Sequence, residues 1–295
     1  MRSRVEHIRT SEGTKLTVRV RGTGPALVMC NGWSTSEFFW KHMLPVWEQH
    51  YTTVCWDYPG HGESEPSRGP SDVQLELLAD SVGRVMDAAG VGRGTLVGYS
   101  MGCQVVLEAA ARMGDRIDAA IPLMGSFEHM VGTATHPVVG HLAAQVLPRL
   151  PAVASTVGHR ALCRVMQSPL GIPLGRLLGM LGPEAAPVDV HDYIAHFMRA
   201  DPTSMVALAV AAQRHSARRA LAAIRAPVLI VAGEEDGLAP PRVAGELLHE
   251  LLPTSRLVVL QAGTHTSLFE HHEEIAVLVN DFLFDVGVLR RVPSN

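Results

Sequence analysis

TLVGYSMGCQVVLEAAAR, residues 95–112, carries the pattern Gly-x-Ser-x-Gly at positions 98–102. The letters before this pattern form a short apolar run typical of a buried strand, and those after it have the apolar spacing of a helix. Small residues on both sides of Ser100 permit a sharp turn from strand to helix, which lifts the serine hydroxyl clear of the sheet. Because the helix begins directly behind the serine, its unpaired N–H groups point towards whatever Ser100 contacts. Ser100 is therefore a candidate nucleophile, and the alternative is a structural turn bracketed by glycines.

A serine hydroxyl is a weak nucleophile unless a base accepts its proton and an acid orients that base. Two loops further along the chain offer these groups. Asp236 follows the strand pattern APVLIVAG (226–233), and His265 follows the next one, RLVVL (256–260). The order serine, acid, histidine, with each residue just past a strand, is one that catalytic triads adopt on parallel sheets.

Strand and helix patterns alternate along most of the chain. ALVMC (26–30) and TTVCW (52–56) are continuous apolar runs, as expected for strands that are covered on both faces. LTVRV (16–20) alternates like a half-buried strand, whereas residues 73–90 have helical spacing and end at Gly90. This alternation predicts an α/β fold with a mostly parallel sheet flanked by helices.

The alternation stops after Gly125. Residues 126–218 contain apolar helical segments but no convincing strand, and the strand pattern returns at 226–233. We therefore expect one α/β core, formed by residues 1–125 and 219–295, that is interrupted by a helical insertion at 126–218. A chain of 295 residues has room for such a second unit.

Together these motifs resemble the α/β-hydrolase superfamily over nearly the whole core. DYPGHGESE (57–65) is similar to that family's loop after its fourth strand, and GEEDGLAP (233–240) is similar to its acid loop. GTHTSLFEHHEE (263–274) is similar to its histidine loop, in which a glutamate follows the histidine by five. The resemblance implies the α/β-hydrolase fold, with the insertion at 126–218 forming a helical cap.

The resemblance also implies three catalytic roles. Ser100 corresponds to the nucleophile, His265 to the general base and Asp236 to the orienting acid. Glu235 is the nearest alternative acid, but the family's aspartate precedes a proline by four, and Pro240 meets that spacing for Asp236.

The loop after the third strand usually begins His-Gly in this family, and the next backbone N–H helps to hold the oxyanion. Here the pair is Asn31-Gly32, so the resemblance gives that role to the N–H of Trp33, with the N–H of Met101 as the second donor. The amide of Asn31 can brace the loop, and we expect Asn31 and Trp33 beside the substrate. Haloalkane dehalogenases also have asparagine at this place, but their nucleophile is an aspartate, so Ser100 argues against that chemistry.

The expected activity is cleavage of a carboxylic ester, or a related acyl bond, of an apolar small molecule through an acyl-enzyme. No cofactor is implied. The many Leu, Val and Met residues of the insertion suggest an apolar acyl or alcohol group. The same triad also serves thioesterases, lactonases, acyltransferases, carbon–carbon bond hydrolases and perhydrolase-type haloperoxidases. Two further alternatives are a cofactor-free oxygenase of the same fold and a ligand-binding receptor with slow turnover.

Composition narrows the choice of partner and compartment. The formal net charge is −4 and no block of Lys and Arg occurs, so nucleic acid is not an expected partner. No apolar run approaches the ~18 residues that a membrane span needs, and the N-terminus lacks the apolar region of a signal peptide. The four cysteines show no paired spacing, which suits a reducing compartment. We expect a cytoplasmic monomer or homodimer.

The segment HDYIAH (191–196) invites a metal interpretation. His191 and His196 are five positions apart, however, so they do not share a helix face as an i, i+4 pair would. We expect no metal site there, and these histidines should line a pocket or brace the cap. Cys103, just inside the helix after Ser100, is expected to be packed rather than reactive.

Overall fold

The computed structural model describes residues 3–133, 145–146 and 152–289. Its centre is an eight-stranded sheet made of β1 (Ser3–Arg9), β2 (Lys15–Gly22), β3 (Ala26–Cys30), β4 (Thr52–Trp56), β5 (Gly94–Tyr99), β6 (Ile117–Leu123), β7 (Leu229–Gly233) and β8 (Arg256–Leu260). The strands lie in the order β1-β2-β4-β3-β5-β6-β7-β8. Strand β2 is antiparallel to both of its neighbours, and all other neighbouring pairs are parallel. The expected mostly parallel sheet is confirmed.

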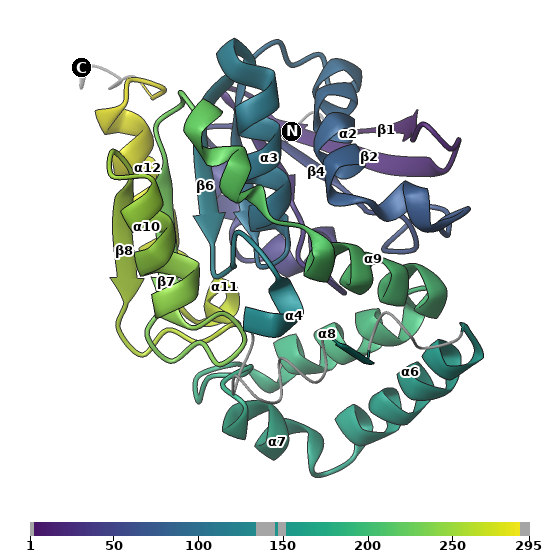
Figure 1. The fold of residues 1–295 in the computed structure, drawn as a ribbon. Coiled ribbons are helices and arrows are strands. Elements are labelled where there is room, and N and C mark those ends of the chain that lie inside the picture. Colours follow the sequence, from purple (N-terminus) through teal and green to yellow (C-terminus); the bar gives the residue numbers. More distant parts are fainter. Residues whose placement is uncertain (1–2, 134–144, 147–151, 290–295) are drawn as a thin grey trace.

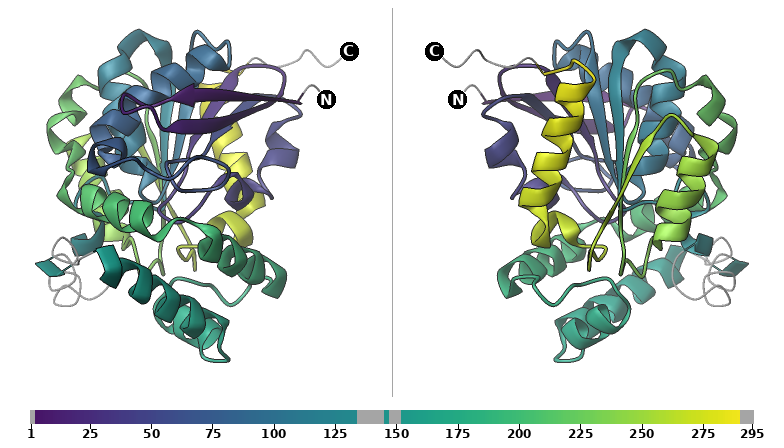
Figure 2. Two further views of the ribbon diagram at one scale, coloured as in Figure 1. Left: turned by 90° about the vertical axis from the view of Figure 1, so that its right-hand side faces the viewer. Right: turned by 90° about the vertical axis from the view of Figure 1, so that its left-hand side faces the viewer.

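Helices cover both faces of this sheet (Figures 1 and 2). One face packs against α2 (Leu75–Ala88), α3 (Gly102–Met113) and α10 (Leu247–Leu251). The other packs against α1 (Leu44–Trp47), α11 (Ser267–Glu270) and α12 (His272–Asp285). Within the part of the chain that the structure describes, no helix combines the length and apolar character needed to cross a bilayer.

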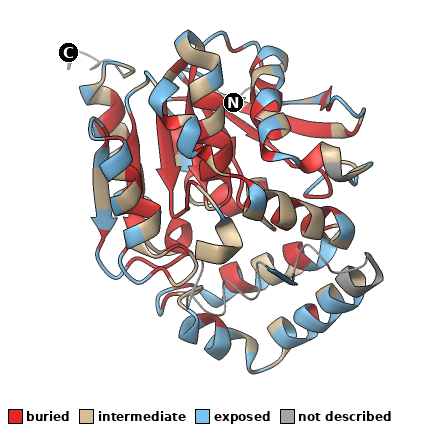
Figure 3. Ribbon diagram, viewed as in Figure 1, coloured by how far each residue is buried: buried red, intermediate tan, exposed pale blue. Residues whose placement is uncertain are grey.

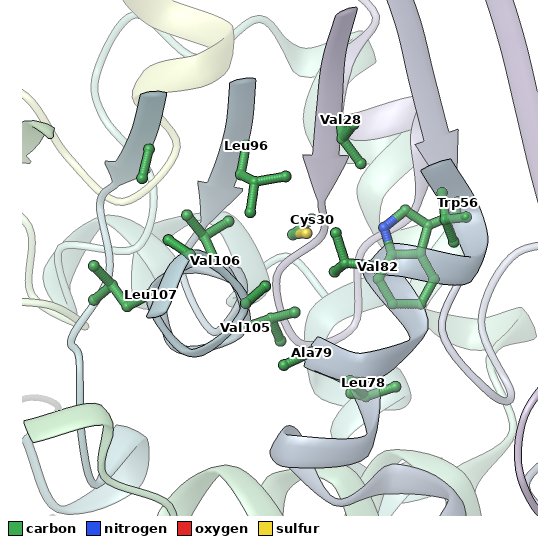
Figure 4. Close-up of a cluster of buried hydrophobic side chains, with 14 of the residues drawn as sticks. Val28, Cys30, Trp56, Leu78, Ala79, Val82, Leu96, Val105, Val106 and Leu107 are labelled. Carbon is green, nitrogen blue, oxygen red and sulfur yellow. The ribbon is translucent and has the colours of Figure 1, made fainter. Parts of the chain in front are cut away.

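The core lies between the sheet and its helices. Figure 3 shows that the strands are largely buried while the outer surfaces of the helices are exposed. On the α2 and α3 face, Val28 and Leu96 of the central strands share one buried cluster with Val82 of α2 and Val105 of α3 (Figure 4). Full burial of each such side chain contributes about 1.5–3 kcal/mol to folding. The packing therefore fixes the strand ends, from which the functional loops leave.

Strand β1 is absent from the sequence prediction. It pairs only with β2, at the edge of the sheet, and all but one of its seven residues are exposed or partly exposed. The sequence SRVEHIR consequently lacks the apolar content that reveals a buried strand. The strand patterns at 26–30, 52–56 and 256–260 are confirmed with those bounds.

The insertion forms a layer of helices beyond the sheet. It includes α4 (Met130–Thr133), α6 (Ala152–Gln167), α7 (Gly171–Leu177), α8 (Pro187–Arg199) and α9 (Pro202–Arg214). Figure 1 shows α6, α7 and α8 set apart from the sheet, with α9 returning towards it. Among the described residues of 126–218, β structure is limited to one isolated bridge, between Glu128 and Ser216.

That bridge joins the two ends of the insertion. The N–H of Ala217 donates to the carbonyl of Phe127 at 3.0 Å, and the N–H of His129 donates to the carbonyl of His215 at 3.0 Å. The chain therefore leaves and re-enters the core at one place, next to the end of β6. Helix α9 also packs into the core, because its Leu208 and Ala212 belong to the buried cluster that covers one face of the sheet.

Candidate active site

Ser100 occupies a sharp turn between β5 and α3. Its φ of +53° lies in the left-handed region, which a residue with a side chain adopts only when its surroundings hold it there. The N–H of Ser100 donates to the carbonyl of Leu123 at 2.9 Å. A Cβ on Gly98 would lie 2.5 Å from the carbonyl oxygen of Gly102, and one on Gly102 would lie 2.2 Å from that of Cys30. Both glycines are therefore required for strand, turn and helix to approach this closely.

The three residues of the expected triad form one chain of hydrogen bonds. The Oγ of Ser100 lies 3.0 Å from Nε2 of His265, and Nδ1 of His265 lies 2.8 Å from Oδ2 of Asp236. The other carboxylate oxygen, Oδ1, lies 3.0 Å from the same Nδ1 and accepts the N–H groups of Leu238 at 2.9 Å and Ala239 at 2.7 Å. These two bonds fix the plane of the carboxylate, and Asp236 is only 3% exposed. The ends of β5, β7 and β8 thus bring together an alcohol, an imidazole and an oriented carboxylate.

The neighbouring acids lie elsewhere. Glu234 and Glu235 are both exposed, whereas Asp236 is buried against the histidine. Glu234 accepts a hydrogen bond from the N–H of Ala262 at 3.0 Å. The geometry therefore favours Asp236 over Glu235 as the acid, in agreement with the spacing to Pro240.

Asn31 lies behind the loop that follows β3. Its amide donates to the carbonyl of Trp56 at 2.6 Å, and its Oδ1 accepts the indole N–H of Trp40 at 2.8 Å. The residue is 0% exposed and does not line the cavity described below. The expected bracing contacts are thus present, but the expected position of Asn31 beside the substrate is not what the structure shows, because both ends of its amide are engaged inside the core.

The loop itself passes close to the nucleophile. A Cβ on Gly32 would lie 2.9 Å from the ring of Tyr99 and 3.1 Å from Cβ of Ser100. Trp33 follows Gly32 in this loop, and Met101 follows Ser100 in the turn. The backbone N–H groups of these two residues were expected to hold the oxyanion. Neither donates to a backbone carbonyl in the loops and turns of the described residues. The two N–H groups that were expected to hold an oxyanion are therefore not engaged in such bonds.

A cavity of about 330 Å³ lies over Ser100, between the core and the insertion. Apart from Ser100 and His265, most of the residues that line it are apolar, and none of the described lining residues is Asp, Glu, Lys or Arg. Trp33 lines it as expected, and its indole N–H donates to the carbonyl of Met205 at 2.8 Å. The lining residues are Trp33, Thr35, Phe39, Tyr99, Ser100, Gly125, Ser126, Met130, Val131, Leu162, Val165, Met166, Gly171, Leu174, Gly175, Leu178, Met180, Leu181, Val190, Tyr193, Ile194, Phe197, Leu238, Ala239, His265 and Thr266.

Tyr99 is a contributor that the sequence reasoning missed. Its hydroxyl donates to the carbonyl of His265 at 2.8 Å, and its ring lies 5.3 Å from the imidazole. The only local signal is its place inside Gly-x-Ser-x-Gly, where the pattern allows any residue. Cys103 is fully buried, and burial raises the pKa of its thiol well above the ordinary value.

The two histidines of α8 lie on different faces of the helix. His191 is exposed, whereas His196 is buried and stacks on Phe38 with ring centroids 4.5 Å apart. Burial lowers the pKa of His196 to about 4. Among the described residues, no group of three or more His, Cys, Asp or Glu side chains is placed to hold a metal ion. His196 therefore takes the bracing place that was expected for the cap histidines.

Acidification should destabilise the protein through His196. The unfolded chain binds this proton near pH 6.5 and the folded chain only near pH 4, so the free energy of unfolding falls as the pH drops between these values. The full shift of the His196 pKa corresponds to roughly 3 kcal/mol in the free energy of unfolding. Denaturant unfolding at pH 7 and pH 4.5, in the parent and in His196→Gln, measures it. The parent should lose more stability than the variant, and equal losses would contradict the prediction.

Comparison with known proteins bears on the family and the fold. A family model described as alpha/beta hydrolase fold matches residues 25–272. A pimeloyl-[acyl-carrier protein] methyl ester esterase of Neisseria meningitidis serogroup C is 29% identical over 262 residues, which are 86% of this chain and 92% of that protein. The crystal structure of a hydrolase from Pseudomonas aeruginosa PA01 has a TM-score of 0.73 at 25% identity and covers 95% of this chain and 98% of that one. An esterase from Exiguobacterium antarcticum has the same fold, with a TM-score of 0.77 at 19% identity, covering 94% of this chain and 98% of that one.

Proposed function

This chain belongs to the alpha/beta hydrolase fold family and is an esterase-like hydrolase, and on that premise we propose that it cleaves carboxylic esters of uncharged, apolar small molecules through an acyl-enzyme on Ser100. One observation carries the proposal. The hydrogen-bond chain from Ser100 through His265 to Asp236 opens directly into an apolar cavity of about 330 Å³.

The geometry supports the following proposed sequence of steps. The Oγ of Ser100 attacks the acyl carbonyl carbon while its proton passes to Nε2 of His265. The N–H groups of Trp33 and Met101 bind the oxyanion of the tetrahedral intermediate. The intermediate collapses, the bond to the alkoxy oxygen breaks, and His265 returns the proton to the departing alcohol. Water then attacks the acyl-enzyme with His265 again as the base, which releases the carboxylic acid and restores Ser100.

The second part of the proposal concerns the substrate. A charged group placed in the cavity would lose its hydration without meeting an Asp, Glu, Lys or Arg side chain, because none of these is among the described lining residues. Apolar lining from α6, α7 and α8 instead favours an alkyl or aryl group on the acyl or alcohol side. The Neisseria relative is named as a methyl ester esterase, which supports ester cleavage.

We further propose that residues 126–218 form a cap that closes this cavity over the core of residues 1–125 and 219–295. The paired junction at Phe127 and Ala217 and the cavity lining drawn from α6 to α8 support this division. We also propose a reducing compartment, the cytoplasm, because all four cysteines are free and buried.

Labelling with a small serine-directed phosphonate, followed by peptide mass mapping, tests the proposed nucleophile. The adduct should lie on the peptide that contains Ser100. A series of 4-nitrophenyl esters from acetate to dodecanoate, with matched thioesters and lactones, then tests the substrate class. Oxygen consumption without labelling would favour the cofactor-free oxygenase, and binding without labelling or turnover would favour the receptor.

Asn31→Ala should lower kcat much more than it raises KM. The variant releases the loop that presents the N–H of Trp33, and an oxyanion donor contributes mainly in the transition state. Misplacing one oxyanion donor should lower kcat by about 10²–10³-fold. The carbonyl of Trp56 and the indole N–H of Trp40 also lose their hydrogen-bond partner. The free energy of unfolding should therefore fall by about 1–3 kcal/mol.

Steady-state kinetics with a short and a long ester measure this effect. Trp33→Phe is the matched control, since it keeps the backbone N–H and removes only the indole at the cavity wall. It should change the preference between the two esters more than kcat. An unchanged kcat in folded Asn31→Ala would leave the loop as an ordinary turn.

A further inference from the structure

The cap segment Gly179–Gly182, which lies in the connection between α7 and α8, contacts both catalytic loops. The carbonyl of Gly179 accepts the N–H of Gly237 at 3.2 Å and the N–H of His265 at 3.4 Å. Gly237 follows the proposed acid, Asp236, directly in sequence. One carbonyl of the cap therefore ties the loop that carries the acid to the loop that carries the base.

This contact is close enough to exclude side chains. Gly179 has a φ of +62°, and a Cβ on it would lie 2.7 Å from the nitrogen of Gly237 and 2.9 Å from the carbonyl oxygen of Glu235. A Cβ on Gly237 would lie 2.0 Å from the carbonyl oxygen of Leu178. Two backbones thus meet through two glycines, one in the cap and one in the acid loop.

A second tie lies on the other side of His265. The carboxylate of Glu270 accepts the N–H of Gly182 at 3.0 Å and the hydroxyl of Thr264 at 3.1 Å. The hydroxyl of Thr266 lies within hydrogen-bonding distance of the same carboxylate, and 3.1 Å from the carbonyl of Met180. The residues immediately before and after His265 are therefore both bonded to Glu270, which in turn holds the cap segment.

We propose that Gly179–Gly182 and Glu270 together position His265 and Asp236 for catalysis, so that the cap acts on the chemical step as well as on the pocket. The proposal rests on the triad proposed above. The acid and the base lie on separate loops, beyond β7 and β8, and their 2.8 Å hydrogen bond depends on how those loops sit relative to each other. A displacement of about 1 Å in such a site can lower the rate about 10²-fold.

The competing role for this segment is shaping of the cavity alone. Met180 and Leu181 line the cavity, so substitutions nearby could alter substrate preference without touching the chemistry. The two roles differ in what they change. Shaping alters KM and the preference between short and long esters, whereas positioning alters kcat equally for every ester and also the rate at which a small phosphonate reacts with Ser100.

Gly179→Ala tests the first tie, with Gly287→Ala as the matched control. Gly287 also has a positive φ, +79°, but a Cβ there would meet no heavy atom within 4 Å. We expect Gly179→Ala to lower kcat about 10- to 100-fold for both 4-nitrophenyl acetate and octanoate. Phosphonylation should slow by the same factor while KM stays within about twofold. Gly287→Ala should match the parent in all of these rates.

Glu270→Ala and Glu270→Gln test the second tie, and they decide the matter if Gly179→Ala does not fold. Glutamine keeps an acceptor for the N–H of Gly182, so it should retain most of kcat and of the phosphonylation rate. Alanine should lose both by about 10-fold or more. Glu273→Gln, an exposed acid three positions further on, is the control for charge and should leave the rates unchanged.

The results separate this proposal from the one on which it rests. Parent protein that neither hydrolyses esters nor takes up the phosphonate would overturn the proposed function. Parent protein that does both, with Gly179→Ala and Glu270→Ala reacting at the parent rate, would overturn the positioning role alone. A change confined to KM for octanoate would assign the segment to cavity shaping.

Discussion

Replacement of Ser100 by alanine should lower kcat for ester hydrolysis by about 10⁴- to 10⁶-fold. The only atom removed is the Oγ that lies 3.0 Å from Nε2 of His265, so no alternative nucleophile takes its place along the triad. The residual rate comes from water that attacks the bound substrate while the oxyanion donors are still in place. KM should change little, because the cavity walls are untouched.

The fold should survive this change. The backbone of residue 100 keeps its φ of +53°, which is held by the N–H bond to Leu123 and by the close approach of Gly98 to Gly102. Circular dichroism and thermal unfolding should therefore match the parent. Phosphonate labelling of the Ser100 peptide should disappear. Retention of more than about 1% of activity by the repurified variant would require a different nucleophile.

Local sequence signals were sufficient to bring together the three residues of the proposed triad. Each lies just beyond an apolar run, and the end of such a run marks the end of a buried strand. Parallel strands bring those ends to one edge of the sheet, so Ser100, Asp236 and His265 could be assigned to one site before their distances were known. The glycines around Ser100 carried further information, since the contacts of Gly98 and Gly102 require a residue without a side chain.

Contacts between segments that lie far apart in the sequence have no comparable local sequence signal. The bond from Gly179 to His265 joins residues that share no period and no motif, and the cap helices offer many glycines with similar surroundings in sequence. The position of Asn31 was misjudged for the same reason. Its partners, Trp40 and Trp56, belong to other elements, and their N–H and carbonyl groups draw the amide into the core.

His265→Ala should be nearly as damaging as Ser100→Ala, since it removes the group that accepts the serine proton and returns it to the leaving alcohol.

Asp236→Asn should lower kcat by about 10⁴-fold, and the geometry gives the reason. The Oδ1 of Asp236 accepts the N–H groups of Leu238 and Ala239, and an asparagine should keep its carbonyl oxygen in that place. Its NH₂ group then faces Nδ1 of the histidine, where Oδ2 now lies 2.8 Å away.

A donor at that position turns Nδ1 into the acceptor and moves the ring proton to Nε2, the atom that must receive the proton of Ser100. The shorter 2.8 Å contact then favours the tautomer that cannot act as a base towards the serine, while the oxygen at the Oδ1 position, 3.0 Å from Nδ1, leaves the productive tautomer as a minor form. Glu235→Gln is the matched control, because Glu235 is exposed and should change kcat by less than about twofold. Steady-state kinetics of the three variants on 4-nitrophenyl acetate measure the order of severity. A damaging Glu235→Gln together with a mild Asp236→Asn would move the role of the acid to Glu235 and contradict the hydrogen-bond chain as the source of activity.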